Sequence, residues 1–264
     1  MSNSDLHPVI RGDGESVLML HGVISDAAFF SEFSSFLSAR YRTVAYDRTG
    51  YGIRPEPEDR SAYTVSAQAE EAADVIREYC GGEAWVFGNS AGGMIALELY
   101  RNHPELVRGL ILLEPSFGLD PESEEELRGW NTELNSYVRE GRIKKALPAF
   151  ARVTGNTGSS DGSIRDMKRT YKNLHNFMFG ELNEVQGYRP EESYLKSISV
   201  PVRIILTENG RGRLFGKTSA RAAQRLGWGV SLFPGGHNAV NELPESCAEI
   251  LMGVLEEIGN ARRT

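Results

Sequence analysis

Cysteine, long apolar runs and clustered positive charge are all scarce in this sequence of 264 residues. Cys80 and Cys247 are its only cysteines, and such low use of cysteine is typical of a reducing compartment. No apolar run approaches the roughly 20 residues that a membrane-spanning helix needs. Residues 1–5 also lack the basic start and the apolar core of a signal peptide. We therefore expect a cytoplasmic protein with no membrane partner.

The charge balance argues against a nucleic-acid partner. The formal net charge is −7 and the sequence pI is about 5.4, whereas a nucleic-acid binder needs a basic face. Two basic pairs, at 144–145 and 262–263, are too short to form one. No His/Cys cluster with metal-ligand spacing occurs either, so we expect no metal and no cofactor. The oligomeric state stays open between a monomer and a homodimer.

Short apolar runs alternate with helical patterns along most of the chain. The expected strands are 17–20, 42–46, 84–87, 110–113, 201–206 and 230–233. The expected helices include 64–80, 91–103, about 217–227 and 244–258. Residues 1–16 are typical of a short strand followed by the turn of a hairpin. Because strands alternate with helices and are nearly all apolar, we predict an α/β fold with a mostly parallel, doubly wound sheet.

The alternation is interrupted between residues 117 and 197. This stretch holds polar helices, a Gly/Ser/Asn/Asp-rich run at 155–163 and several aromatic residues. The aromatic residues are Trp130, Tyr137, Phe150, Tyr171, Phe177 and Phe179. We interpret 117–197 as a helical insertion into a core formed by 1–116 and 198–264.

One serine lies between an apolar strand and an apolar helix, in the pentapeptide Gly-Asn-Ser-Ala-Gly at 88–92. Gly-x-Ser-x-Gly in that setting is the pattern of a nucleophile elbow, a sharp turn with the serine at its tip. Gly88 and Gly92 suit the turn because a side chain at either position would collide with the neighbouring strand or helix. The alternative is a glycine-rich turn with an incidental serine, but the flanking strand and helix favour a catalytic Ser90.

Several polar residues follow the expected strands directly. They are His21, Asp47, Ser90, Glu114, Glu208 and His237. Sites in open α/β sheets form at the carboxyl ends of the strands. We therefore expect these side chains to share one edge of the sheet.

Four motifs together resemble the α/β-hydrolase fold superfamily. They are Leu-His-Gly at 20–22, Asp-Arg-Thr-Gly-Tyr-Gly at 47–52, the elbow at 88–92 and Pro-Gly-Gly-His at 234–237. The resemblance covers almost the whole chain in the expected order. It implies a serine nucleophile, and it implies that 117–197 is the helical cap, or lid, that this family carries there.

A serine hydroxyl needs a base to take its proton. The family resemblance places that base at His237, and the alternative is a loop histidine without a role. His21 belongs to the motif that shapes the oxyanion loop, and with Gly22 it is a candidate for the substrate pocket. The remaining histidines lie in a tail, at a helix end and in the insertion; they are His7, His103 and His175.

The acid that orients the base departs from the usual family pattern. Most members carry an aspartate just after the strand that corresponds to 201–206, and here Gly210 stands in its place. Glu114 is our first candidate, because some relatives, such as zearalenone-type lactonases and certain haloalkane dehalogenases, place the acid after the preceding strand. An acid that ends an apolar strand also needs a partner if it is buried. Glu208 is the second candidate.

The resemblance implies that the oxyanion hole consists of two backbone N–H groups, those of Val23 and Ala91. Asp47 and Arg48 are expected to brace their loop rather than to take part in catalysis. The aromatic residues of the insertion mostly pack among themselves, although a lid must present some of them to a pocket.

These features predict a serine hydrolase that cleaves a small-molecule carboxylic ester or lactone through an acyl-enzyme on Ser90. A C–C bond hydrolase or a cofactor-free perhydrolase with the same triad is an alternative. Dehalogenase and epoxide hydrolase chemistry is disfavoured, because both use an aspartate in place of Ser90. A third possibility, favoured by the missing aspartate, is a slow-turnover or non-catalytic ligand-binding protein.

Overall fold

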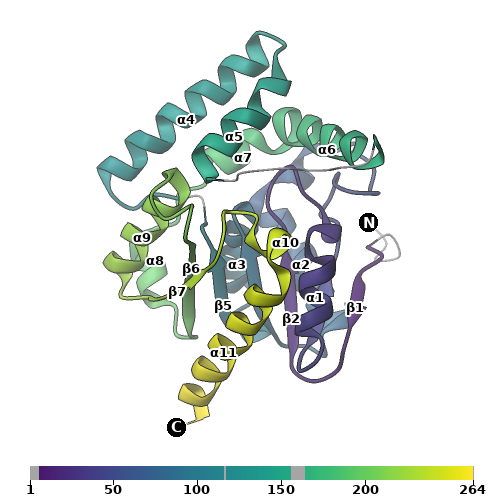
Figure 1. The fold of residues 1–264 in the computed structure, drawn as a ribbon, viewed down its shortest axis with the longest axis vertical. Coiled ribbons are helices and arrows are strands. Elements are labelled where there is room, and N and C mark those ends of the chain that lie inside the picture. Colours follow the sequence, from purple (N-terminus) through teal and green to yellow (C-terminus); the bar gives the residue numbers. More distant parts are fainter. Residues whose placement is uncertain (1–5, 116, 156–163, 264) are drawn as a thin grey trace.

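A seven-stranded sheet forms the centre of the molecule (Figure 1). The computed structural model of the chain describes residues 6–115, 117–155 and 164–263. Its strands are β1 (Val9–Arg11), β2 (Ser16–Leu20), β3 (Arg42–Ala45), β4 (Ala84–Asn89), β5 (Val107–Leu113), β6 (Val202–Thr207) and β7 (Gly229–Phe233). They lie in the order β1-β3-β2-β4-β5-β6-β7. All neighbours pair in parallel except β1 and β3. The predicted mostly parallel α/β sheet is confirmed.

The predicted hairpin at the start of the chain is wrong in its strand pairing. A turn does follow β1, with positive φ angles at Gly12 and Gly14. However, β2 already has β3 and β4 as its neighbours. β1 therefore pairs with β3, antiparallel and at the edge of the sheet, with Val9 opposite Ala45. Residues 1–5 of the predicted segment lie outside the described residues.

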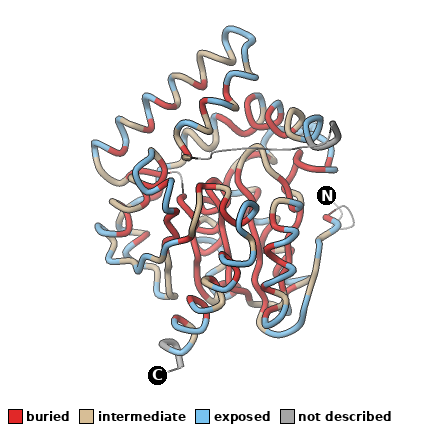
Figure 2. Tube along the Cα trace, in the orientation of Figure 1, coloured by how far each residue is buried: buried red, intermediate tan, exposed pale blue. Residues whose placement is uncertain are grey.

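Helices cover both faces of the sheet (Figure 1). On one face lie α1 (Ser31–Leu37), α10 (Ala239–Glu242) and α11 (Pro244–Arg263). On the other lie α2 (Val65–Tyr79), α3 (Ala91–Asn102), α8 (Glu192–Ser197) and α9 (Leu214–Leu226). The central strands are buried from end to end, as expected for strands packed on both sides (Figure 2).

Local sequence signals start and stop these helices. The Thr64 hydroxyl accepts a hydrogen bond from the Ala67 N–H at the start of α2, and such capping satisfies an otherwise unpaired backbone donor. Gly227 ends α9 with a φ of 69°, a conformation in which glycine has no steric penalty. α9 begins a few residues earlier than predicted and α11 extends beyond Ile258. No helix within the described ranges is both long and apolar enough to span a bilayer.

A further group of helices lies over the carboxyl ends of the strands (Figure 1). It consists of α4 (Pro121–Arg139), α5 (Ala146–Thr154), α6 (Ile164–Asn176), a π-helical turn (Phe177–Glu181) and α7 (Leu182–Gly187). Their buried residues form an apolar cluster of their own, which Tyr51 and Phe215 join from the sheet side. These helices therefore cover the carboxyl ends of the strands, where the polar residues lie.

Candidate active site

Ser90 occupies the turn between β4 and α3. Its backbone has φ 54° and ψ −118°, a left-handed region that is strained for any residue other than glycine. A Cβ at Gly88 would lie 2.6 Å from the Gly92 carbonyl oxygen, and one at Gly92 would lie 2.1 Å from the Leu20 carbonyl oxygen. The pentapeptide therefore brings β2, β4 and α3 into close contact and presents Ser90 at the strand ends.

Glu114 and His237 meet at the carboxyl ends of the strands. The His237 Nδ1 lies 2.7 Å from the Glu114 Oε2, and both side chains are buried. The other carboxylate oxygen of Glu114 accepts hydrogen bonds from the N–H and the hydroxyl of Thr207, at 2.8 and 2.7 Å. When His237 donates from Nδ1, its Nε2 is left as the acceptor for a hydroxyl proton. Glu208 is exposed, and within the described part of the chain no hydrogen bond joins it to His237.

Gly210 explains how Glu114 fits there. A Cβ built on Gly210 would lie 2.4 Å from the Glu114 Oε1 and 2.2 Å from the Thr207 hydroxyl oxygen. The Glu114 carboxylate therefore fills the space into which a side chain at position 210 would extend. The glycine that stands at the usual aspartate position leaves room for a carboxylate that comes from the neighbouring strand.

Two backbone N–H groups border Ser90. Ala91 is the first residue of α3, so its N–H has no partner within the helix. The Val23 N–H donates to no protein acceptor among the described residues. Both residues line one pocket with Ser90. They can supply donors to an oxygen bound beside the serine.

His21 and Gly22 are not among the residues that line this pocket. His21 is fully buried, with Nδ1 2.8 Å from the Gly22 carbonyl oxygen and Nε2 accepting from the Arg48 N–H at 3.1 Å. Burial, with the adjacent Arg48 charge, lowers the pKa of His21 well below its usual value of 6.5. His21 therefore stays neutral and holds the backbone that carries Val23.

The other sequence candidates lie elsewhere. The Asp47 carboxylate accepts from the N–H groups of Ala27 and Ile53, each at 2.8 Å, and so braces its loop. His103 pairs with Glu70 at 2.8 Å, and His175 lies 3.2 Å from Glu56. In the part of the chain that the structure describes, no group of three or more His, Cys, Asp or Glu residues could hold a metal ion.

Aromatic residues connect His237 with the pocket wall. The Phe215 ring lies 5.6 Å from the His237 ring, centroid to centroid. Trp130 contacts both Phe215 and Phe150, and Phe150 contacts Phe177, at centroid distances of 6.5, 4.9 and 5.8 Å. Of the aromatic residues noted between 117 and 197, these three line the pocket. The others do not: Tyr137 and Tyr171 are partly buried, and Phe179 is exposed.

Some residues at the site gave no signal in the sequence. Asn131, Gln186 and Arg189 line the pocket beside its apolar wall. Glu181, in the π-helical turn, is fully buried against Arg48. A polar residue in a polar helical segment looks the same in sequence whether it faces solvent or the sheet. Only the packing of these helices distinguishes the two.

Comparison with known proteins agrees with this architecture. An uncharacterized hydrolase of Bacillus subtilis, YraK, is 26% identical over 258 residues, which cover 96% of this chain and 93% of the relative. A thermophilic esterase from Thermogutta terrifontis has a similar structure, with a TM-score of 0.72, 20% identity and coverage of 96% and 93% of the two chains. The esterase EaEST from Exiguobacterium antarcticum gives a TM-score of 0.74, 19% identity and coverage of 95% of both chains.

The structural likenesses show a shared fold. The sequence itself matches the model of the alpha/beta hydrolase family from residue 17 to residue 250. That match spans nearly the whole chain and includes the elbow serine, Glu114 and His237. This chain therefore belongs to the alpha/beta hydrolase family.

Proposed function

We propose that this protein is a serine hydrolase that cleaves carboxylic esters or lactones. The observation that carries the proposal is the buried hydrogen bond between His237 and Glu114, at the strand ends where Ser90 lines a pocket. A base oriented by a carboxylate, at the same strand ends as an elbow serine, fits the arrangement that activates a hydroxyl for acyl transfer. The names of the two structurally similar esterases agree with this chemistry.

The proposed reaction has two halves. Ser90 attacks the substrate carbonyl while His237 takes its proton, and the Glu114 carboxylate stabilises the imidazolium that forms. The N–H groups of Val23 and Ala91 stabilise the oxyanion of the tetrahedral intermediate. His237 then protonates the leaving alcohol, and a water molecule activated by His237 releases the acid from Ser90.

The pocket lining supports a substrate with an apolar acyl or ring portion. Aliphatic and aromatic side chains form most of the wall, with Asn131, Gln186 and Arg189 as its polar members. Most of these residues belong to the stretch 117–197, and we propose that the part of it from α4 to α7 acts as a cap that selects the acyl group, whereas α8 packs on the sheet face. Apolar pockets with a few polar groups are typical of small-molecule sites.

The non-catalytic alternative rested on the missing aspartate. Since the Glu114 carboxylate occupies the space in front of Gly210, the absence of an aspartate there no longer favours that alternative. A C–C bond hydrolase or a perhydrolase would use the same three residues, so substrate trials must separate these reactions.

Active-site labelling and a substrate panel test the proposal together. We expect a fluorophosphonate probe to label the protein once, at Ser90, and Ser90→Ala to abolish the labelling. We also expect turnover of p-nitrophenyl acetate, butyrate or octanoate, or of a γ- or δ-lactone, by the unaltered protein and none by Ser90→Ala. No labelling and no turnover would falsify the proposal.

A further inference from the structure

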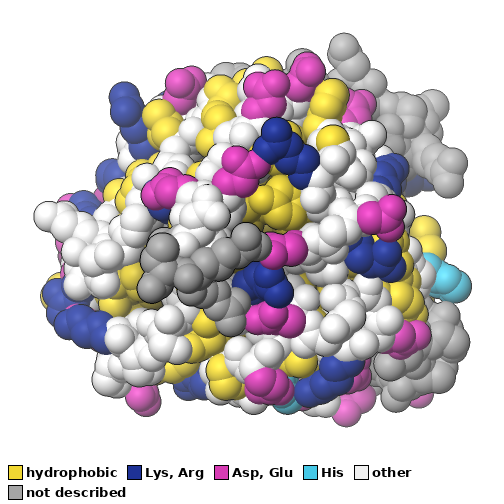
Figure 3. All heavy atoms as spheres, turned by 90° about the horizontal axis from the view of Figure 1, so that it is seen from below, with side chains coloured by type: hydrophobic (Ala, Val, Ile, Leu, Met, Phe, Trp, Pro, Cys, Tyr) yellow, Lys and Arg dark blue, Asp and Glu magenta, His cyan; other side chains and the backbone are white. Residues whose placement is uncertain are grey.

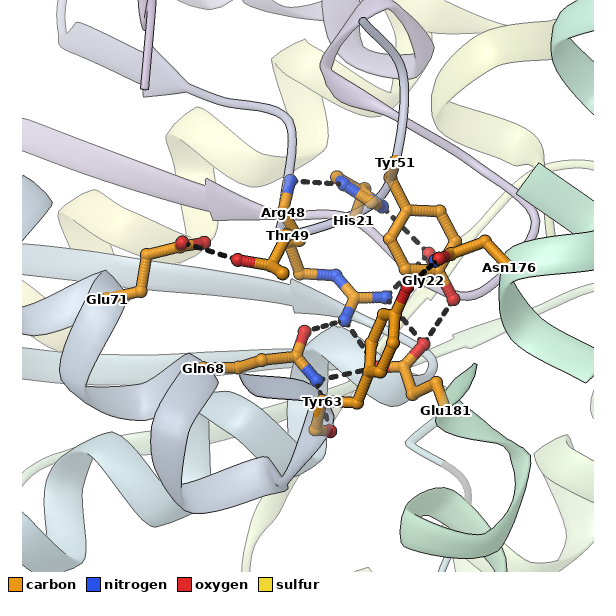
Figure 4. Close-up of polar contacts among 10 residues, drawn as sticks. All are labelled: His21, Gly22, Arg48, Thr49, Tyr51, Tyr63, Gln68, Glu71, Asn176 and Glu181. Carbon is orange, nitrogen blue, oxygen red and sulfur yellow. Dashed lines mark hydrogen bonds and ion pairs between the residues drawn. The ribbon is translucent and has the colours of Figure 1, made fainter. Parts of the chain in front are cut away.

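A buried ion pair joins the helices above the sheet to the loop after β3 (Figure 4). Arg48 and Glu181 are both almost wholly inaccessible to solvent, and two guanidinium nitrogens of Arg48 contact the Glu181 carboxylate. Tyr51 donates to the same carboxylate, and so does the Gln68 side-chain amide at 2.8 Å. Burial alone would raise the pKa of Glu181, but the charge of Arg48 and the hydrogen bonds from Arg48, Tyr51 and Gln68 together lower it below its usual value. Both groups are therefore charged at neutral pH.

The same arginine reaches the peptide that carries Val23. The Arg48 Nη2 donates to the Gly22 carbonyl oxygen at 3.1 Å. Its backbone N–H donates to His21 Nε2, and His21 Nδ1 lies 2.8 Å from that same Gly22 oxygen. Arg48 therefore holds the Gly22 carbonyl twice, directly and through the imidazole (Figure 4).

Holding this carbonyl also directs an N–H group. The Gly22 carbonyl and the Val23 N–H belong to one peptide unit, which is planar and trans, so they point in opposite directions. When Arg48 and His21 fix the oxygen on one side, the Val23 N–H is fixed on the other. This peptide lies against the nucleophile, since a Cβ at Gly22 would be only 3.1 Å from the Ser90 Cβ.

We infer that Arg48 and Glu181 are positioning residues for the oxyanion hole, Arg48 by holding the Gly22–Val23 peptide and Glu181 by holding Arg48. The inference rests on the proposed function. A buried guanidinium without a counter-charge is strongly unfavourable, so Arg48 can remain behind the oxyanion loop only while Glu181 faces it.

Glu181 also links the hole to the pocket. It is the last residue of the π-helical turn that begins at Phe177, and Leu182 follows it. Phe177 and Leu182 both line the pocket. The helices that form the pocket wall therefore contribute, through one carboxylate, to the geometry of the backbone donor that the reaction needs.

The test is Glu181→Gln, a substitution of nearly the same shape that removes the counter-charge. We expect kcat for a p-nitrophenyl ester, counted per Ser90 labelled by fluorophosphonate, to fall about 100-fold, the scale of losing one oxyanion donor. The affinity for 2,2,2-trifluoroacetophenone, a ketone that forms a tetrahedral adduct with a catalytic serine, should fall by a similar factor. KM should change little, because binding of the ground-state ester does not depend on the oxyanion hole.

Glu71→Gln is the matched control. Glu71, in α2, pairs at 2.7 Å with Arg54, which lies on the same loop as Arg48. Glu71 is also largely buried, but neither Glu71 nor Arg54 hydrogen-bonds to Gly22. We expect this variant to keep the kcat and the ketone affinity of the unaltered protein. An equal loss in both variants would show a general effect of broken ion pairs and would overturn the inference.

Arg48→Lys serves if Glu181→Gln fails to fold. Lysine keeps a positive charge for Glu181 but lacks the planar fork that reaches the carboxylate and the Gly22 oxygen together. We expect it to lose kcat and ketone affinity in parallel. If a folded variant of either kind retains both, the inference is wrong while the proposed function stands. If the unaltered protein neither turns over esters nor takes the label, both proposals fall.

Discussion

Two residues of the candidate triad leave their strands through a left-handed backbone. Ser90 follows β4 with a φ of 54°, and Glu114 follows β5 with a φ of 42°. Such angles in residues other than glycine cost on the order of 1–3 kcal/mol each and persist only where the surroundings enforce them. Here the Ser90 N–H donates to the Leu113 carbonyl, and the Glu114 N–H donates to the Ile205 carbonyl, at 2.9 and 3.0 Å. Hydrogen bonds to neighbouring strands therefore hold both residues at the carboxyl ends of the strands.

Exchange of each candidate acid for its amide tests which carboxylate orients His237. We expect Glu114→Gln to lower kcat by about 10⁴-fold, the scale measured when a triad acid becomes an amide, because the amide favours the wrong histidine tautomer. Glu208→Gln should have little effect, because Glu208 is exposed. Steady-state kinetics on a p-nitrophenyl ester checks both. A larger loss in Glu208→Gln would reverse the assignment.

Because the Glu114 carboxylate lies where a side chain at position 210 would be, we predict that the orienting acid can be moved from position 114 to position 210. Gly210→Asp alone should reduce stability and activity, since its side chain would enter the space of the Glu114 carboxylate. Combined with Glu114→Ala, the same aspartate should regain part of the roughly 10⁴-fold loss in kcat expected without an acid. Gly212→Asp, which has no atom within 4 Å of its Cβ, is the control. Equal activity of Glu114→Ala with and without Gly210→Asp would contradict the prediction.

At the scale of elements, the elbow depends on how closely α3 approaches the strands. Glycine at 88 and 92 lets the first turn of the helix lie against β4 and the end of β2, with the atom separations given above. A Cβ at Gly93 would also come within 3.0 Å of the Pro115 side chain. The helix therefore sits too close to the sheet for any side chain on its inner face at these positions.

Glycine-to-alanine exchange in two helices should have opposite effects on stability. Gly92→Ala should lower the free energy of unfolding by roughly 1–3 kcal/mol or more, because its Cβ would overlap the Leu20 carbonyl oxygen. Gly253→Ala in α11 should raise it by about 0.5–1 kcal/mol, because that position is open and the alanine loses less chain entropy on folding. Urea unfolding measures both. Two changes of the same sign would contradict this account of the elbow.

At the scale of the whole molecule, charge of neither sign is concentrated on the end opposite α4–α7. Figure 3 shows acidic and basic side chains interspersed on the end of the molecule opposite α4–α7. On that end Arg108 forms ion pairs with Glu15 and Glu83, at 2.6 and 2.7 Å, from the start of neighbouring strands. These side chains are partly exposed, and ion pairs near the surface each contribute about 0–1 kcal/mol. We therefore expect the pH dependence of stability to come mainly from buried ionisable groups.

Buried His21 should make the fold sensitive to mild acid. Its folded pKa lies well below 6.5, so below about pH 6.5 the unfolded chain binds a proton that the native protein does not. The free energy of unfolding should therefore decrease as the pH is lowered below about 6.5, by about 1.4 kcal/mol per pH unit from His21 alone. Glu181 adds a loss only below about pH 4.5, because its folded pKa is lowered from that value. Urea unfolding between about pH 5 and pH 6 should show a shallower slope for His21→Asn. Parallel slopes would refute the assignment.

The sequence alone determined the features that depend on neighbouring residues. The apolar runs predicted the parallel strands, and the pentapeptide at 88–92 predicted the elbow, since strand, turn and helix signals all act within a few residues. The family resemblance added His237 and Glu114 as expectations. It could not say how Glu114 would reach the base, because their contact joins residues 123 positions apart.

Only the tertiary structure decided the features that depend on distant packing. β1 pairs with β3 because β2 has no free edge, which no local turn signal reveals. The Glu114 carboxylate, which follows another strand, occupies the space where a side chain at position 210 would lie. Glu181 is buried against Arg48 although its segment is polar. In each case the role of a residue depends on the side chain or strand that packs against it. That neighbour is distant in the sequence, so local sequence patterns do not predict it.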